Sequence, residues 1–199
     1  MYYIAAPHDE ITGLANYLDQ QLSAIRASAY GLTDEQARQT PCRSSLSIGG
    51  IVKHIAYGLR GYAATMRQSG RADISDDDYA AYGDSLALSD SETMADVLAE
   101  FDAARAEILD LFASSDPDAD FLEPPAPWFG QTEAHPTKLR YFLVHQIEEA
   151  ARHAGHADII REQLDAEMVP NLQMTIEGVP ANDFFTPYEP APGTLGAST

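Results

Sequence analysis

The stretch that decides the fold of this chain is His145-Gln146-Ile147-Glu148-Glu149-Ala150-Ala151-Arg152-His153-Ala154-Gly155-His156. It lies in a segment, about 137–164, whose apolar residues recur at the three-to-four spacing of one buried helix face. Those residues are Leu139, Phe142, Leu143, Ala150, Ala157, Ile160 and Leu164. Glu149 and His153 fall on the same face, where a globular helix ordinarily carries apolar side chains. The segment therefore predicts a long helix that turns a carboxylate and an imidazole toward the core.

Glu149 and His153 are spaced to act together. Four residues correspond to about 400° of helical rotation, so the two side chains stack one turn apart, about 40° out of line. Buried polar groups need a partner that offsets their desolvation, and a divalent metal suits carboxylate and imidazole alike. A surface ion pair is the alternative that the apolar flanks disfavour, while a buried Glu–His hydrogen bond without metal stays open. His145 and His156 lie about 80° and 60° from His153, so Glu149 fits the face best.

Composition limits the classes of function. The 199 residues suit one domain with a real hydrophobic core, and 31 acidic against 12 basic residues give a formal charge of −19. Such a charge repels phosphate, so we expect a small-molecule substrate, not nucleic acid or an anionic membrane. The N-terminus resembles no signal peptide and no apolar run approaches membrane length. The single Cys42 excludes an internal disulfide, so a cytoplasmic location is expected.

The rest of the chain predicts three more long helices. Apolar spacing and polar N-terminal residues place them at about 9–29, 47–68 and 89–113. The last is expected to begin at a capping box, Ser89 to Glu92, and another box opens a short helical turn at Thr33. Residues 70–88 are expected to be a solvated loop, since Asp76-Asp77-Asp78 lacks the spacing of a calcium loop.

Two further segments carry expectations. Residues 114–136 read as a long connection in which Trp128 and Phe129 either cover a pocket or plug one end of the helices. After Asp165, frequent Pro and Gly exclude another long helix. We expect a short strand at 173–176 and an extended tail, 166–199, that packs on its own domain or on a partner subunit.

A third ligand for the pair on the long helix comes from His54. It lies between Ile51 and Gly58 on the edge of a core-facing helix surface. His8 and His135 are placed at a helix start and in the long connection. His54, Glu149 and His153 therefore form the most economical triad, which leaves metal positions open for water or substrate.

The sequence resembles the DinB-like superfamily. The run Gly49-Gly50-Ile51-Val52-Lys53-His54-Ile55-Ala56 resembles its second-helix motif, and the runs 127–130, 139–141, 145–149 and 152–162 resemble its fourth-helix signature. The resemblance covers about 9–165. It implies an all-α, up-and-down four-helix bundle over 1–165, with an irregular tail after it. It also implies a metal held by His54, Glu149 and His153. Many relatives have histidine at all three positions, whereas the related mycothiol-dependent maleylpyruvate isomerase has glutamate at the middle one. His156 and His145 are then expected to support the ligands without binding the metal.

The resemblance also bears on activity. The isomerase has an additional C-terminal domain with catalytic basic residues, and the tail from Ala166 is too short for one, so isomerisation is not expected. The resemblance implies a thiol-dependent, mycothiol-type S-transferase, since an open metal site lowers the pKa of a bound low-molecular-weight thiol. The alternatives are a hydrolase that uses metal-bound hydroxide and a non-catalytic metal-binding stress-response protein. Zinc is the first expectation for the metal, followed by nickel or iron, and a homodimer is an open expectation.

Overall fold

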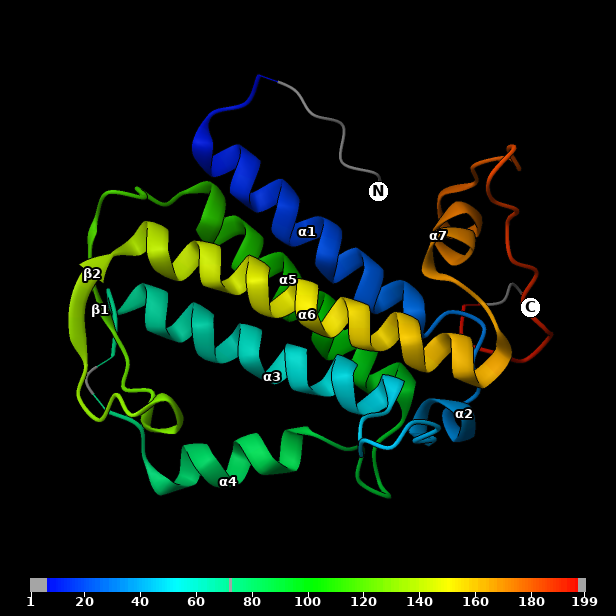
Figure 1. Ribbon diagram of the computed structural model, residues 1–199, viewed down its shortest axis with the longest axis horizontal. Coiled ribbons are helices and arrows are strands. Elements are labelled where there is room, and N and C mark those ends of the chain that lie inside the picture. Colours follow the sequence, from blue (N-terminus) through cyan, green and yellow to red (C-terminus); the bar gives the residue numbers. More distant parts are fainter. Residues whose placement is uncertain (1–6, 72, 197–199) are drawn as a thin grey trace.

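The computed structural model describes residues 7–71 and 73–196, and these are mostly helical (Figure 1). Residues 1–6, 72 and 197–199, which belong to the predicted domain, loop and tail, lie outside the described residues. The long helices are α1 (Glu10–Ser28), α3 (Ile48–Arg67), α5 (Met94–Ala113) and α6 (Leu139–Asp165). The shorter ones are α2 (Asp34–Arg38), α4 (Asp76–Ser85) and α7 (Val169–Glu177). The four predicted long helices are confirmed.

The long helices pack through their apolar faces. Figure 1 shows them side by side, with α3 lying mainly against α5 and α6 mainly against α1. Leu22, Ile51, Phe101 and Leu143 are buried in the one large core that they share. Helices α3 and α6 also contact each other. Among the described residues, no helix has the length and apolar character needed to cross a bilayer.

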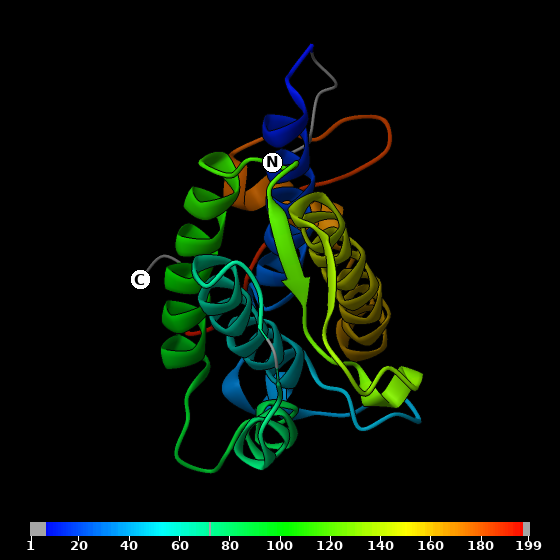
Figure 2. The same cartoon turned by 90° about the vertical axis from the view of Figure 1, so that its left-hand side faces the viewer.

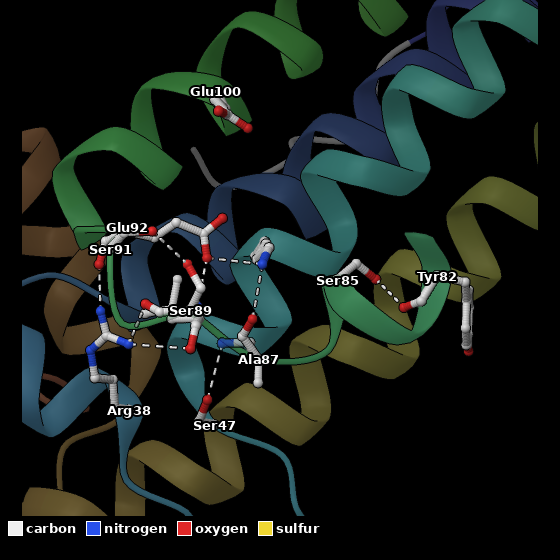
Figure 3. Close-up of polar contacts among 12 residues, drawn as sticks. Arg38, Ser47, Tyr82, Ser85, Ala87, Ser89, Ser91, Glu92 and Glu100 are labelled. Atoms are coloured by element: carbon white, nitrogen blue, oxygen red, sulfur yellow. Dashed lines mark hydrogen bonds and ion pairs between the residues drawn. The ribbon is translucent and has the colours of Figure 1, made fainter. Parts of the chain in front are cut away.

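Helix α5 begins later than predicted. Its N-cap is Thr93, whose side chain accepts a hydrogen bond from the backbone N–H of Asp96. The predicted box at Ser89 forms only a turn, in which the Glu92 carboxylate accepts from the backbone N–H of Ser89 at 2.6 Å and from Lys53 of α3 at 2.9 Å. Arg38 of α2 donates to carbonyls of the same turn (Figure 3). These partners hold the segment against α2 and α3, so α5 begins only at Met94.

The predicted loop at 70–88 is wrong, because residues 76–85 form helix α4. Ser75 caps its N-terminus, and the Asp78 carboxylate reaches back to the Ser75 backbone N–H at 2.8 Å in a complete capping box. Arg71 forms an ion pair with the same carboxylate. Three aspartates in the first turn also suit the positive end of the helix dipole. The acidic run is thus a helix start, and α4 lies alongside α3 (Figure 1).

The long connection before α6 contains a β-hairpin. Strands β1 (Asp120–Glu123) and β2 (His135–Lys138) pair antiparallel, with Asp120 opposite Lys138 and Glu123 opposite His135. A 3₁₀ turn, η1 (Pro127–Phe129), lies between them. Figure 2 shows the hairpin next to the ends of α3 and α6. The side chains of Trp128 and Phe129 are 64% and 78% exposed, so the end-plug alternative is wrong.

The strand predicted at 173–176 is also wrong, since these residues belong to helix α7. Pro170 is tolerated in its first turn, where no helical partner for its nitrogen is required, and Gly178 ends it with a positive φ of 66°. The chain then returns to the turn between α1 and α2. There Leu195 accepts from the backbone N–H of Gly31 and donates to the carbonyl of Leu32. The described part of the tail thus contacts its own chain.

Candidate metal centre

The structure brings together the three residues that the sequence singled out. His54 comes from α3, and Glu149 and His153 come from α6; one candidate ligand atom from each lies within 4.8 Å of the others. The imidazole rings of His54 and His153 have centroids 5.1 Å apart. His54 is buried, Glu149 is partly exposed, and only a small part of the His153 side chain is exposed. Three separate donor groups therefore converge on one point between the two helices.

Glu149 and His153 are positioned by the small apolar residues around them. Ala150, Ala154 and Ala157 are buried, so this part of α6 is held in the core. The helical period then places Glu149 and His153 one turn apart on the side toward His54. The Nε2 atom of His153 lies 3.3 Å from Oε1 of Glu149. The side chains of His153 and Glu149 are 12% and 29% exposed, so solvent reaches part of the cluster.

A hydrogen-bond chain from α4 determines the protonation of the His54 ring. The Ser85 hydroxyl donates to the backbone carbonyl of Tyr82 at 2.7 Å (Figure 3), because a carbonyl oxygen can only accept. Ser85 Oγ must then accept from Nδ1–H of His54, which lies 2.9 Å away. A neutral imidazole protonated on Nδ1 has its lone pair on Nε2. Nε2 of His54 is therefore the atom available as a ligand.

The electrostatics of the cluster favour the forms that bind metals. Burial lowers the pKa of His54, the neighbouring His153 lowers it further, and Glu149 acts in the opposite direction. The hydrogen bond from His153 lowers the pKa of Glu149, and burial opposes it. Metals bind neutral imidazole and ionised carboxylate. Both pKa shifts therefore favour the protonation state in which each side chain can bind a cation.

The donor set fits a divalent transition metal. Two imidazoles and a carboxylate are the ligand set of many catalytic zinc sites, and three protein ligands leave a coordination position open. The Nδ1 atom of His153 is buried without a hydrogen-bond partner among the described residues. Buried polar atoms usually have a partner, so hydrogen bonding does not explain why this nitrogen is buried. The cluster could hold an ion such as zinc, nickel or iron.

The two other histidines of the stretch differ in position. His156 lies beside His153, with ring centroids 5.6 Å apart. His145 instead contacts Glu148 on its own helix, with Nδ1 3.3 Å from the carboxylate. Arg152 donates to the same Glu148 at 2.9 Å. Of the two residues expected to support the ligands, only His156 has a ring contact with one.

Sequence reasoning missed the contribution of α4. Ser85 and Tyr82 both contact His54, the latter through an edge-on ring contact at 5.1 Å. They were missed because residues 70–88 were expected to be a loop. The available signal was the pair Ser75 and Asp78, which has the three-residue spacing of a capping box although Asp replaces the usual Glu or Gln.

Fold and site together define a class: a helical protein with a candidate His₂Glu metal centre between two of its long helices. A family model described as mycothiol-S-transferase matches residues 13–166. The chain therefore belongs to the mycothiol S-transferase family, which is DinB-like, and the predicted resemblance is confirmed. Neither the search of curated proteins nor that of solved structures returned a match.

Proposed function

We propose that this protein is a metal-dependent, mycothiol-type S-transferase whose metal is held by His54, Glu149 and His153, with zinc as the first choice. The observation that carries the proposal is the convergence of these three side chains, partly reached by solvent, in a chain of this family. In this proposal α1, α3, α5 and α6 form the up-and-down DinB-like bundle that positions the ligands.

The residues of the site have distinct tasks in this chemistry. The metal, when bound, would lower the pKa of a thiol and so stabilise its thiolate. His54 and His153 supply neutral nitrogen donors, and Ser85 keeps His54 in the required tautomer. Glu149 supplies a negative charge that offsets part of the charge of the cation. During transfer the thiol proton leaves to solvent, the sulfur forms a bond to an electrophilic carbon, and the leaving group departs with the electrons of the broken bond.

The first test measures metal content and thiol transfer in the same preparations. Purified protein loaded with zinc, nickel or iron is mixed with mycothiol and an alkylating electrophile, and the conjugate is followed by mass spectrometry. We expect metal-dependent conjugate formation that is lost, together with the metal, in His54→Ala and Glu149→Ala. The matched control is His145→Ala, a histidine of the same helix that contacts Glu148. It should retain metal and activity.

Other outcomes would contradict the proposal in different ways. Ester or amide hydrolysis without thiol would favour the metal-hydroxide alternative, which uses the same ligands. Metal-dependent stability without turnover in a broad electrophile screen would favour a binding role. Unchanged metal content in His54→Ala would show that the cluster is not the metal site.

A further inference from the structure

Helix α4 lies against α3 almost without apolar packing (Figure 1). Ser85 is the one buried residue of the ten described from Asp76 to Ser85. The rings of Tyr79 and Tyr82 are 43% and 53% exposed, and none of the side chains described for residues 76–85 belongs to the hydrophobic core. Helices in proteins are stable mainly because an apolar face is packed, and isolated helices this short are marginal in water. Helix α4 must therefore depend on specific polar contacts.

The C-terminal end of α4 is placed beside His54 by a close approach of two backbones. A Cβ at Gly50 of α3 would lie 2.3 Å from the carbonyl oxygen of Leu86, the C-cap residue of α4. Gly50 precedes His54 by four residues, which is about one helical turn. Glycine at position 50 thus lets Leu86 reach α3 one turn before His54. The residue before Leu86 is Ser85, which this approach brings to the level of the His54 ring.

The last turn of α4 contacts His54 through two residues. The Oγ atom of Ser85 lies 2.9 Å from Nδ1 of His54, and the ring of Tyr82 meets the His54 ring edge-on at 5.1 Å. The Ser85 hydroxyl donates to the Tyr82 carbonyl, three residues back, because the helical turn brings the two together. Ser85 can therefore accept from His54 in this geometry only while the last turn of α4 is folded.

The stabilising contacts of α4 are concentrated at its other end. Ser75 and Asp78 form the capping box, and Arg71 forms an ion pair with the Asp78 carboxylate. The last turn has no basic residue to suit the negative end of the helix dipole, and Asp84 there opposes it. The turn that carries Ser85 is thus intrinsically weak. It depends on the cap ten residues earlier and on the contact with His54.

We propose that α4 is a positioning element whose folding is coupled to metal occupancy of the candidate site through Ser85 and His54. Folded α4 holds the Nδ1–H group of His54 and so presents Nε2 as the ligand atom. A bound metal would in turn hold the ring that Ser85 contacts. Coupling of this kind is reciprocal, so the factor by which folded α4 strengthens metal binding equals the factor by which metal stabilises α4. This inference rests on the proposed function, since it takes His54 as a ligand, and it names what controls retention of the metal.

Zinc affinity in variants of Ala80 tests the first half of the coupling. Ala80 lies in the middle of α4 with an exposed side chain. Ala80→Pro removes a helical hydrogen bond and clashes with the preceding turn, which shifts the folding equilibrium of α4 by about 100-fold or more. Competition with a chromophoric chelator should show zinc binding about 10–100-fold weaker, equal to that of Ser85→Ala. The double variant should bind no more weakly than either single variant. Ala80→Gln, which keeps a good helix former, is the matched control and should retain wild-type affinity.

Hydrogen exchange of residues 76–85, followed by mass spectrometry, tests the second half. Zinc should slow exchange of α4 about 10–100-fold in the wild type, the same factor as in the affinity measurement. In Ser85→Ala, zinc should change it less than about twofold, because the link to His54 is gone. Ser75→Ala removes the cap and should speed exchange of metal-free α4 about fivefold. Thr33→Ala removes the corresponding hydroxyl from the capping box of α2 and should leave exchange of α4 unchanged.

The remaining outcomes separate this inference from the proposed function. Far-UV circular dichroism shows whether Ala80→Pro loses α4 alone, and the exchange experiment on Ser85→Ala decides the question without a helix breaker. Wild-type zinc affinity in a folded Ala80→Pro would overturn the coupling, and so would zinc protection of α4 that survives in Ser85→Ala. Either result would leave the metal site and thiol transfer intact. A wild-type protein that takes up no zinc, nickel or iron would overturn the proposed function, and the coupling with it.

Discussion

At the scale of single residues, the site depends on which ring nitrogen of each histidine is free. The chain of hydrogen bonds from His54 through Ser85 to the Tyr82 carbonyl leaves Nε2 of His54 unprotonated. Partners of this kind orient metal ligands, and their removal typically weakens metal binding although the ligands themselves remain. We therefore expect Ser85 to strengthen metal binding without contacting the ion.

Replacing Ser85 with alanine should weaken zinc binding about 10–100-fold, because His54 loses the acceptor that holds its tautomer and orientation. Competition with a chromophoric chelator measures the affinity. Ser85→Thr keeps the hydroxyl and should retain most of it, and Ser44→Ala, in an exposed loop, should have no effect. Wild-type affinity in Ser85→Ala would contradict the assigned role of this hydrogen bond.

Acidification should release the metal only at a pH below 6.5. Protons compete with metal for each ligand, so binding is lost as the pH falls through the ligand pKa values. Burial lowers the pKa of His54 from its ordinary 6.5, and the hydrogen bond from His153 lowers that of Glu149 from 4.5. Both side chains thus keep their binding form to lower pH than free side chains would. Release can be followed with a metal indicator, and a midpoint above 6.5 would disagree with these shifts.

At the scale of elements, the joint between α3 and the hairpin positions one end of the site. Gly70 follows α3 with a φ of +123°, and it forms an isolated bridge to Leu122 of β1. A Cβ at Gly70 would lie 2.2 Å from the carbonyl oxygen of Leu122, which is backbone and cannot move aside cheaply. Only glycine allows the hairpin, and with it Glu123, to approach the helices this closely.

Gly70→Ala should lower the free energy of unfolding by about 1–3 kcal/mol, since the alanine must adopt a disfavoured φ and displaces β1. Chemical denaturation gives the value. Gly61→Ala is the matched control, at an exposed position of α3 where an added Cβ meets no atom within 4 Å. This substitution should raise the free energy of unfolding by up to about 1 kcal/mol. Equal effects of the two substitutions would argue against the close joint.

At the scale of the whole molecule, Arg161 links three distant segments. It is fully buried on α6 and donates to the carbonyls of Ser28 and Tyr30 at 2.8 and 2.6 Å. It also pairs with Asp165, and its guanidinium lies 5.3 Å from the ring centroid of Tyr188 in the tail. One buried cation thus holds the end of α1, the end of α6 and the returning chain together.

Arg161→Met should therefore destabilise the protein by about 1–3 kcal/mol, because the carbonyl of the buried Ser28 loses its charged donor. Arg152→Met provides the comparison. Arg152 pairs with Glu148 on the same helix, but its side chain is 62% exposed, and such surface pairs contribute about 0–1 kcal/mol. Denaturation curves of the two variants should differ clearly, and similar midpoints would show that the buried network contributes little.

The net charge of −19 predicts no affinity for nucleic acid. Nucleic-acid binding relies on neutralising phosphates with basic residues, and here acidic residues outnumber them. A mobility-shift assay with duplex DNA at physiological salt should show free DNA at micromolar protein. A shifted band that survives an excess of unrelated competitor DNA would overturn this prediction.

The sequence alone determined the long helices and the candidate ligands. Helical periodicity is a local property, so the apolar face of residues 137–164 and the intrusion of Glu149 and His153 could be read directly from residue order. His54 followed because it is the histidine on a core-facing edge of another long helix. Tertiary structure alone decided what lies around them. Tertiary packing brings Ser85 to His54, brings Glu123 close at Gly70 and buries Gln146. These contacts join residues far apart in the chain, so the spacing of residues within one segment cannot predict them. Residues 173–176 also became helical rather than extended, because packing of α7 on α1 outweighs a weak local preference for strand.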